Sequence, residues 1–119
     1  MEPGAPVTTI YVCGPMSGYV DHNEPEFRAT QELLSGPGTT VVVPHDLAPM
    51  NHDGLCPRSH AGATSTGDHG VACYLRADLV HLLLYCDVVF VLRGWEASVG
   101  ARLEVQVAAA CGIPLEFQS

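Results

Sequence analysis

Short apolar runs that end at glycine or proline are the feature that most constrains the fold of this chain. Three such runs, Val7–Cys13, Thr39–Val43 and Asp87–Leu92, are rich in β-branched residues, and Gly14 and Pro44 close the first two. Continuous apolar runs of this length are typical of strands in a parallel sheet that is covered on both faces. The sequence therefore predicts buried parallel strands joined by helical crossovers.

Helical patterns separate these apolar runs. Pro25, between two glutamates, is typical of a first helical turn and opens a helix that continues to about Leu34. Further helices are expected over Ala72–Tyr85 and Val99–Cys111. The predicted buried stripe of the first of these two consists of Leu75, Leu79, Leu82 and Leu83.

The element order is therefore β-α-β-loop-α-β-α-β, ending in a short strand over Ile113–Phe117 after the helix-terminating Gly112. This order predicts an α/β fold, a three-layer sandwich with a small parallel sheet of about four to five strands, flavodoxin- or Rossmann-like. With 119 residues, of which 47% are hydrophobic and 15% charged, the chain is expected to form one globular domain over residues 1–119.

The charge balance excludes one class of partner. The formal net charge is −8 with five Lys plus Arg residues, so no basic surface is expected to track polymeric nucleic acid. No apolar run reaches the roughly 18 residues of a membrane span, and no signal segment is visible. We therefore expect a cytoplasmic protein without membrane contact. Cys56 lies in a loop, and the other cysteines are expected to be buried reduced thiols: Cys13, Cys73, Cys86 and Cys111.

Residues 45–70 lack hydrophobic periodicity. A stretch of this length inside a small domain is typically an active-site lid, a binding loop or a disordered insert. Its potential metal ligands are His45, His52, Cys56, His60 and His69. Structural zinc sites use tight ligand pairs, and only the spacing of Cys56 and His60 approaches that pattern. Solvated loop histidines are favoured over a metal site, so no metal is predicted.

A carboxylate on an apolar helix face is the first candidate for chemistry. Glu104 lies within the predicted apolar face of the third helix, which also contains Gly100, Leu103, Val107, Ala108 and Cys111. A carboxylate there must be compensated by a partner or used in a reaction. The structural alternative is that Glu104 pairs with Arg102 or caps neighbouring backbone.

A second acid, Asp78, falls among the leucines of the preceding helix. Its structural alternative is a salt bridge to Arg102 or Arg76, or a cap on a neighbouring loop. Asp87, at the start of a strand, is interpreted as a turn or cap residue.

Three segments that follow predicted strands are expected to meet at one crevice: the Gly14–Gly18 loop, the Arg93–Ser98 loop and residues 45–70. Ligands of open parallel sheets bind beyond the carboxyl ends of the strands. Ser98 and Gly100 would place a hydroxyl and backbone N–H groups at a helix N-terminus, which suits a phosphate or a hydroxylated sugar. The glycine spacing of the first loop is neither a Walker A nor a GxGxxG pattern.

An ordered set of motifs gives the chain a resemblance to a known family. The motifs are YVCGPMSG, an Asn-x-Pro-x-x-Phe element (Asn23, Pro25, Phe27), VVVP, RAD, CDVVFVL and GWEASVGARLE. Together they resemble the short nucleoside 2-deoxyribosyltransferase-like proteins that are frequent in phage and bacterial genomes. The resemblance extends from about Ile10 to Phe117.

This resemblance implies cleavage of the N-glycosidic bond of a nucleoside or nucleotide. In that family a Glu at the position of Glu104 attacks the anomeric carbon of the deoxyribose, and an Asp at the position of Asp78 helps to protonate the departing base. Two carboxyls in differently desolvated settings can divide into nucleophile and acid around an oxocarbenium-like transition state. The chemistry expected from the resemblance therefore fits the residues.

The residue at the position of Ser98 distinguishes two activities among the proteins that this chain resembles. The transferases typically carry Asp at this position, whereas hydrolases of 5′-monophosphates resemble this chain in carrying Ser. An Asp would repel a phosphate by roughly 1–4 kcal/mol. A 5′-phosphate is therefore expected on Ser17, Gly18, Ser98 and Gly100, although the first loop has Met16 and no basic residue where some relatives have Arg.

The remaining candidates are aromatic or basic. Tyr11 is a candidate catalytic residue that orients Glu104, with core packing as the alternative, and Tyr19 is a candidate to pack on the sugar or base. Trp95 would flank the base or lie at a subunit contact, and Arg102 would serve the site or a neighbouring subunit. All candidate substrate-binding residues are Gly14, Pro15, Met16, Ser17, Gly18, Tyr19, Asn23, Trp95, Ser98, Gly100 and Arg102.

Three functions remain open. The leading one is hydrolysis of the base–sugar bond of (2′-deoxy)nucleoside 5′-monophosphates, followed by base exchange between nucleosides and by non-catalytic binding or sequestration of a nucleotide. No cofactor is implied, and the expected partner is a small nucleoside or nucleotide. Family members are commonly homodimers, and the apolar helix over Val99–Cys111 suits burial against a partner, so a homodimer or higher homo-oligomer is expected.

Overall fold

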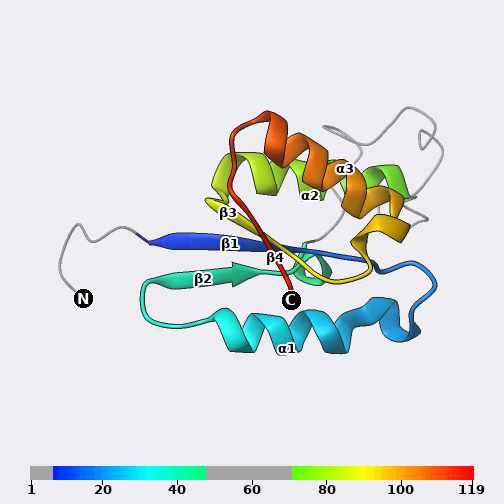
Figure 1. Cartoon of the computed structure of the whole chain (residues 1–119), viewed down its shortest axis with the longest axis horizontal. Coiled ribbons are helices and arrows are strands. Elements are labelled where there is room, and N and C mark those ends of the chain that lie inside the picture. Colours follow the sequence, from blue (N-terminus) through cyan, green and yellow to red (C-terminus); the bar gives the residue numbers. More distant parts are fainter. Residues whose placement is uncertain (1–6, 48–70) are drawn as a thin grey trace.

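Parallel strands form the central layer of the protein in the order β2-β1-β3-β4, in a computed structural model that describes residues 7–47 and 71–119 (Figure 1). The strands are β1 (Thr8–Cys13), β2 (Thr39–Val42), β3 (Val88–Val91) and β4 (Leu115–Phe117). In this register Tyr11 of β1 lies beside Val42 of β2 and Val89 of β3. The carboxyl end of β1 is therefore flanked by those of its two neighbours.

Helices cover both faces of the sheet. Figure 1 shows α1 (Glu24–Leu34) on one face, with α2 (Val71–Tyr85) and α3 (Val99–Ala110) on the other. The predicted three-layer α/β fold with a small all-parallel sheet is thus confirmed. The element order is also as expected, and the described helices and strands begin and end within two residues of the predicted limits.

Successive side chains of β1 point to opposite faces of the sheet, so this strand contributes to the core on both faces. Tyr11 and Cys13 pack in a cluster with Leu82 of α2 and Ala108 of α3, whereas Val12 points to the other face and packs with Phe27 of α1. This is the period of two that an extended chain imposes on its side chains. One strand therefore supplies both halves of the core and directs Tyr11 toward α3.

The buried faces of the two later helices differ from those predicted. In α2 the residues Ala77 and Leu82 are buried, whereas Leu83 is 42% exposed. In α3 the buried face is Ala101, Glu104, Val105 and Ala108. It is shifted from the predicted set around Gly100 and Leu103 because the small Ala101 faces β1, where its carbonyl accepts a hydrogen bond from Cys13 Sγ at 3.5 Å.

The cysteine prediction is partly correct. Cys13 and Cys86 are buried thiols, but Cys111 is exposed because it caps the C-terminus of α3 instead of continuing its buried face. Cys56 and the side chain of Cys73 lie outside what the structure describes. Asp87 acts as the expected cap, since its Oδ2 accepts a hydrogen bond from the backbone N–H of Thr9 at 2.8 Å.

A short left-handed turn precedes α1. Within the 3-10 segment η1 (Val20–Asn23), Asp21, His22 and Asn23 have φ angles of 52°, 53° and 62°. Such left-handed backbone costs about 1–2 kcal/mol per residue, although Asn, Asp and His tolerate it better than most types. Two side chains brace the turn: Asn23 Nδ2 donates to Pro15 O at 3.0 Å, and His45 Nε2 donates to His22 O at 3.0 Å.

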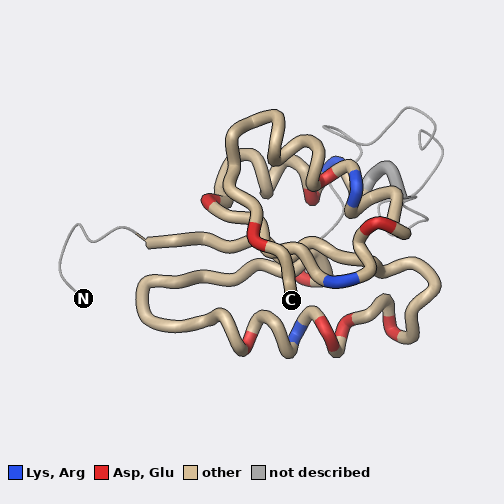
Figure 2. The backbone as a smooth tube through the Cα atoms, viewed as in Figure 1, with Lys and Arg blue, Asp and Glu red and all other residues tan. Residues whose placement is uncertain are grey.

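Only the first part of the predicted loop over residues 45–70 is described. His45 belongs to a short 3-10 helix, η2 (Pro44–Asp46), instead of an irregular segment. His52, Cys56, His60 and His69 lie outside the described residues. Within the described residues, none of the helices is both long and apolar enough to span a membrane. Figure 2 shows acidic positions on all three α-helices and few basic ones.

Candidate active site

A pocket of about 520 Å³ opens where β1 and β2 end and α3 begins. Gly14, Met16 and Ser17 follow β1, and Pro44, His45 and Leu47 follow β2. Ser98, Gly100, Ala101 and Glu104 enter from α3, and Tyr74, Leu75 and Asp78 from α2. Two further lining residues, His22 and Glu24, precede and begin α1. The crevice therefore lies at the expected edge of the sheet.

Glu104 is held at the base of this pocket by a short hydrogen bond. The Tyr11 hydroxyl donates to Glu104 Oε2 at 2.6 Å, and both side chains are buried, with Glu104 only 5% exposed. Burial raises the pKa of the Glu104 carboxyl to about 7, while the hydrogen bond from Tyr11 acts in the opposite direction. The carboxylate is thus available near neutral pH and has one oxygen fixed by Tyr11.

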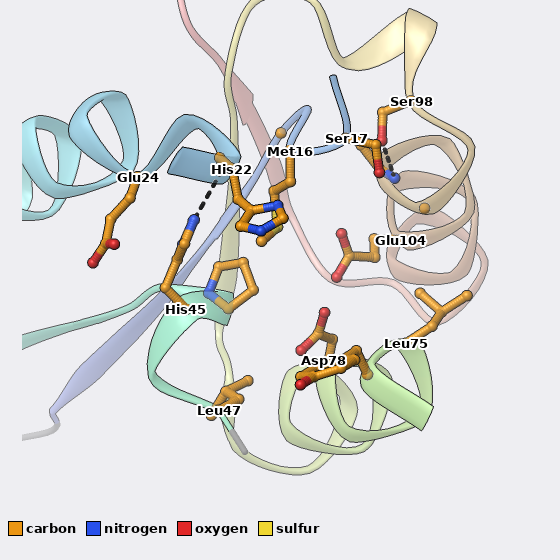
Figure 3. A pocket seen from close by; sticks show the side chains of 15 residues that line it. Met16, Ser17, His22, Glu24, His45, Leu47, Leu75, Asp78, Ser98 and Glu104 are labelled. Carbon is orange, nitrogen blue, oxygen red and sulfur yellow. Dashed lines mark hydrogen bonds between the residues drawn. The ribbon is translucent and has the colours of Figure 1, made fainter. Parts of the chain in front are cut away.

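Asp78 faces Glu104 across the pocket (Figure 3). Burial and the nearby charge of Glu104 raise the pKa of Asp78 to about 8. Its Oδ1 atom is buried and has no hydrogen-bond partner among the described residues. A protonated Asp78 would therefore have an unused donor or acceptor facing the space between the two acids.

One structural alternative for the two acids, pairing with Arg102, finds little support. Arg102, the partner considered for both, is exposed and does not belong to the described lining of the pocket. An ion pair would lower the pKa of a carboxyl, whereas the pKa values of Glu104 and Asp78 are both raised. Within residues 7–47 and 71–119 no salt bridge involves Glu104. The negative charge of Glu104 instead adds to the rise in the pKa of Asp78.

The first loop contributes some of its predicted residues to the pocket. Gly14, Met16 and Ser17 line it, whereas Pro15, Gly18 and Tyr19 lie in the same loop outside its described lining. A Cβ at Gly14 would lie 2.8 Å from Leu92 Cβ, so glycine lets the loop pass close to the end of β3. Asn23 is outside the lining too and braces the loop through Pro15.

Ser98 begins α3. Its Oγ accepts a hydrogen bond from the backbone N–H of Ala101 at 3.2 Å, which is an N-cap contact that leaves the hydroxyl hydrogen able to donate toward a ligand. A Cβ at Gly100 would meet open space. Trp95 instead packs against Phe117, with ring centroids 5.7 Å apart, and does not line the described pocket.

Some lining residues were not predicted as site residues, chiefly His22, Glu24, Tyr74 and Leu75. His45 and Leu47 belong to the 45–70 segment that was expected at the crevice, and Pro44 directly precedes it at the end of β2. His22 gives no comparable sequence signal, because it reaches the pocket only through the left-handed turn. His45 Nδ1 is buried without a hydrogen-bond partner in the described part of the chain.

No group of three or more His, Cys, Asp or Glu side chains suited to a metal ion occurs among the described residues. Four of the potential ligands named from the sequence, His52, Cys56, His60 and His69, lie outside that part of the chain.

Comparisons with known proteins place this geometry in a wider context. The family model "Domain of unknown function (DUF4406)" matches residues 8–117. A solved structure described as a 2-desoxiribosyltransferase from Leishmania mexicana matches with a TM-score of 0.61 and 22% identity, covering 92% of this chain and 63% of that one. A conserved protein from Enterococcus faecalis V583 matches with a TM-score of 0.61 and 20% identity, covering 93% of this chain and 62% of that one.

These matches confirm the resemblance to deoxyribosyltransferase-like proteins at the level of the fold. The chain spans less than two thirds of each of the two solved relatives, 63% and 62% respectively. No curated protein sequence matches it.

Proposed function

We propose that this chain, which belongs to the family described as a domain of unknown function (DUF4406), hydrolyses the base–sugar bond of (2′-deoxy)nucleoside 5′-monophosphates. The observation that carries the proposal is the pair of carboxyls, the buried Glu104 and the half-buried Asp78, that face each other in one pocket (Figure 3). Cleavage of a glycosidic bond needs one carboxyl as nucleophile and one as acid. Two neighbouring carboxyls with raised pKa values can provide one ionised carboxylate and one protonated carboxylic acid near neutral pH.

The reaction proceeds in two steps in this proposal. An oxygen of Glu104 attacks the anomeric carbon, the bond to the base breaks, and the base leaves with the bonding electron pair and takes the proton of Asp78. Water then attacks the anomeric carbon of the glycosyl ester and gives its proton to the Asp78 carboxylate. The products are free base and a sugar 5-phosphate, and both acids return to their starting forms.

Tyr11 positions the nucleophile in this scheme. Its hydroxyl engages Oε2 of Glu104, and in this scheme the other carboxyl oxygen makes the attack. The rate is expected to be greatest between about pH 7 and pH 8, because it needs Glu104 deprotonated and Asp78 protonated.

The shape of the pocket supports a nucleotide bound in one direction. Figure 3 shows Ser17 and Ser98 at one end and the apolar Leu47 toward the other, with the two acids between them and Leu75 beside the acids. Hydroxyl and backbone N–H groups at the N-terminus of α3 suit a phosphate. The apolar end suits a base, which places the sugar beside Glu104.

Base exchange between nucleosides is the second candidate, and the fold shared with a solved 2-desoxiribosyltransferase favours it. Both reactions begin with the same attack, and they differ in whether water or a second base accepts the sugar. A third candidate is a non-catalytic module that binds or sequesters a nucleotide.

One set of incubations separates the three candidates. The purified protein is mixed with dCMP, dGMP and the matching deoxynucleosides, with and without a free acceptor base, and products are separated by chromatography. Release of base only from the monophosphates supports hydrolysis, and a new nucleoside supports exchange. No product, together with nucleotide binding that survives Glu104→Ala, supports the binding module and refutes the proposal.

A homo-oligomer and a cytoplasmic location remain part of the proposal. Large apolar side chains on α2 and α3 are exposed, including Leu84 (67%), Tyr85 (63%) and Val99 (73%). Such residues on neighbouring helices suit a contact between copies of the chain. Light scattering on the purified protein should give the mass of a dimer or a higher oligomer, and a monomer mass would rule this contact out.

A further inference from the structure

The imidazole of His22 enters the pocket from an unfavourable backbone turn. Figure 3 shows this side chain directed toward the middle of the pocket, with Glu104 and Asp78 on the opposite side. The turn of Asp21, His22 and Asn23 has φ angles of 52°, 53° and 62°. Strained backbone of this kind persists only where the surrounding structure holds it, and it concentrates at active sites and ligand clamps.

Contacts from other segments hold this turn in place. His22 O accepts a hydrogen bond from His45 Nε2 at 3.0 Å, and the His22 backbone N–H donates to Tyr19 O at 3.1 Å. Asn23 Nδ2 adds a bond to Pro15 O at 3.0 Å. The backbone of His22 is thus bonded on both sides, and its side chain is left for the pocket.

Carboxyl groups dominate the charges that line the pocket, since Asp78 and Glu104 belong to it together with Glu24, whose carboxylate pairs with Arg28 at 3.0 Å. Within its described lining there is no Lys or Arg, and only His22 and His45 can become cationic. His45 already uses Nε2 on the turn and lies against Phe27, with ring centroids 4.6 Å apart. The His22 imidazole has no hydrogen bond within residues 7–47 and 71–119, so it is the group most open to an anionic ligand.

We propose that His22 contacts the 5′-phosphate of the substrate and thereby selects nucleotides over nucleosides. The inference rests on the proposed function and adds a specificity-determining residue to it. Ser17 and Ser98 offer only neutral donors, and the chain has a net charge of −8, which repels a phosphate. An imidazole donates a hydrogen bond in both of its protonation states and carries a positive charge in one of them.

Binding measurements test this proposal without requiring turnover. The four common deoxynucleoside 5′-monophosphates and the four deoxynucleosides are titrated calorimetrically into Glu104→Gln protein, which cannot form the glycosyl ester. His22→Asn is added as the test variant because Asn tolerates the left-handed backbone and removes the imidazole. His22→Lys retains a cation, and Asp21→Asn is the matched control from the same turn, outside the described pocket lining.

We expect His22→Asn to weaken monophosphate binding by about 10- to 100-fold, the range for a hydrogen bond to a charged group, and to change nucleoside binding by less than about twofold. His22→Lys should restore most of the preference, and Asp21→Asn should leave it within about twofold. Parallel weakening of both ligand classes, or an unchanged preference, would overturn the proposal. The proposal would also be overturned if Glu104→Gln protein with an intact His22 bound both ligand classes equally or bound neither of them.

The two proposals fail in different ways. If no base is released by active protein but His22→Asn still removes a preference for monophosphates, the catalytic function is wrong and the role of His22 stands. If base is released and the preference is independent of His22, only the role of His22 is wrong.

Discussion

Replacing buried Glu104 with glutamine is expected to stabilise the protein at pH 8 while abolishing its activity. Glu104 is 5% exposed, and burial raises the pKa of its carboxyl from 4.5 to about 7. Between these values the folded protein keeps a proton that the unfolded chain has released, so stability falls as pH rises. The accumulated cost at pH 8 is about 3 kcal/mol, because one pKa unit corresponds to about 1.36 kcal/mol.

Glutamine removes this cost without leaving the Tyr11 hydroxyl unpaired, since its carbonyl oxygen can accept the same hydrogen bond. In urea denaturation at pH 8 the free energy of unfolding of Glu104→Gln should exceed that of wild type by about 3 kcal/mol. At pH 5 the gain should shrink to under about 1 kcal/mol, because this pH lies only about half a unit above the ordinary carboxyl pKa of 4.5 and little of the cost has accumulated there.

The exposed Glu96 provides the matched control, and Glu96→Gln should show no pH-dependent gain. If Glu104→Gln were equally stable or less stable than wild type at pH 8, Glu104 would have to be compensated by a positive charge. The reasoning that treats it as an uncompensated, reactive carboxyl would then be refuted.

Other substitutions probe the remaining roles. Tyr11→Phe removes the hydrogen bond to Glu104, so the pKa of Glu104 should rise, kcat at pH 7 should fall roughly tenfold, and the acidic limb of the pH–rate profile should move up by about one unit. Asp78→Asn should lower kcat by about 10²- to 10⁴-fold for ordinary nucleotides. The same substitution should leave the rate nearly unchanged for a nucleotide whose base is already cationic, such as 7-methylguanine. Chromatography of the released base would measure both rates. Ser98→Asp preserves the N-cap of α3 but should raise KM for monophosphates by about tenfold, without raising KM for nucleosides. Equal effects on both substrate classes would argue against a phosphate at Ser98.

Local sequence patterns were sufficient to predict the fold. Each strand is a short apolar run closed by a turn residue or followed by a loop, and each helix has a recognisable start or end, so order and approximate limits follow from local chemistry. The position of the buried face on α3 was predicted one residue away from its true place. Several α3 residues on both sides of that face are apolar, and contact with β1 decides which of them are buried.

The two acids were found from the sequence because a carboxyl on an apolar helix face is unusual. The hydrogen bond from Tyr11 was anticipated only as one of two alternatives, since register and strand direction determine which side of β1 faces α3. His22 could not be placed, because its position depends on consecutive left-handed residues that are braced by contacts far apart in the chain.

The central claim is that Glu104 attacks the sugar, and mass spectrometry of a trapped intermediate tests it most directly. A deoxynucleoside 5′-monophosphate with fluorine at the 2′ position destabilises the oxocarbenium-like transition state and slows release of the glycosyl enzyme. After incubation and digestion, a sugar phosphate should be found attached to Glu104 in the peptide that follows Arg102. Base release with no adduct on Glu104, or with the adduct on another residue, would contradict the account.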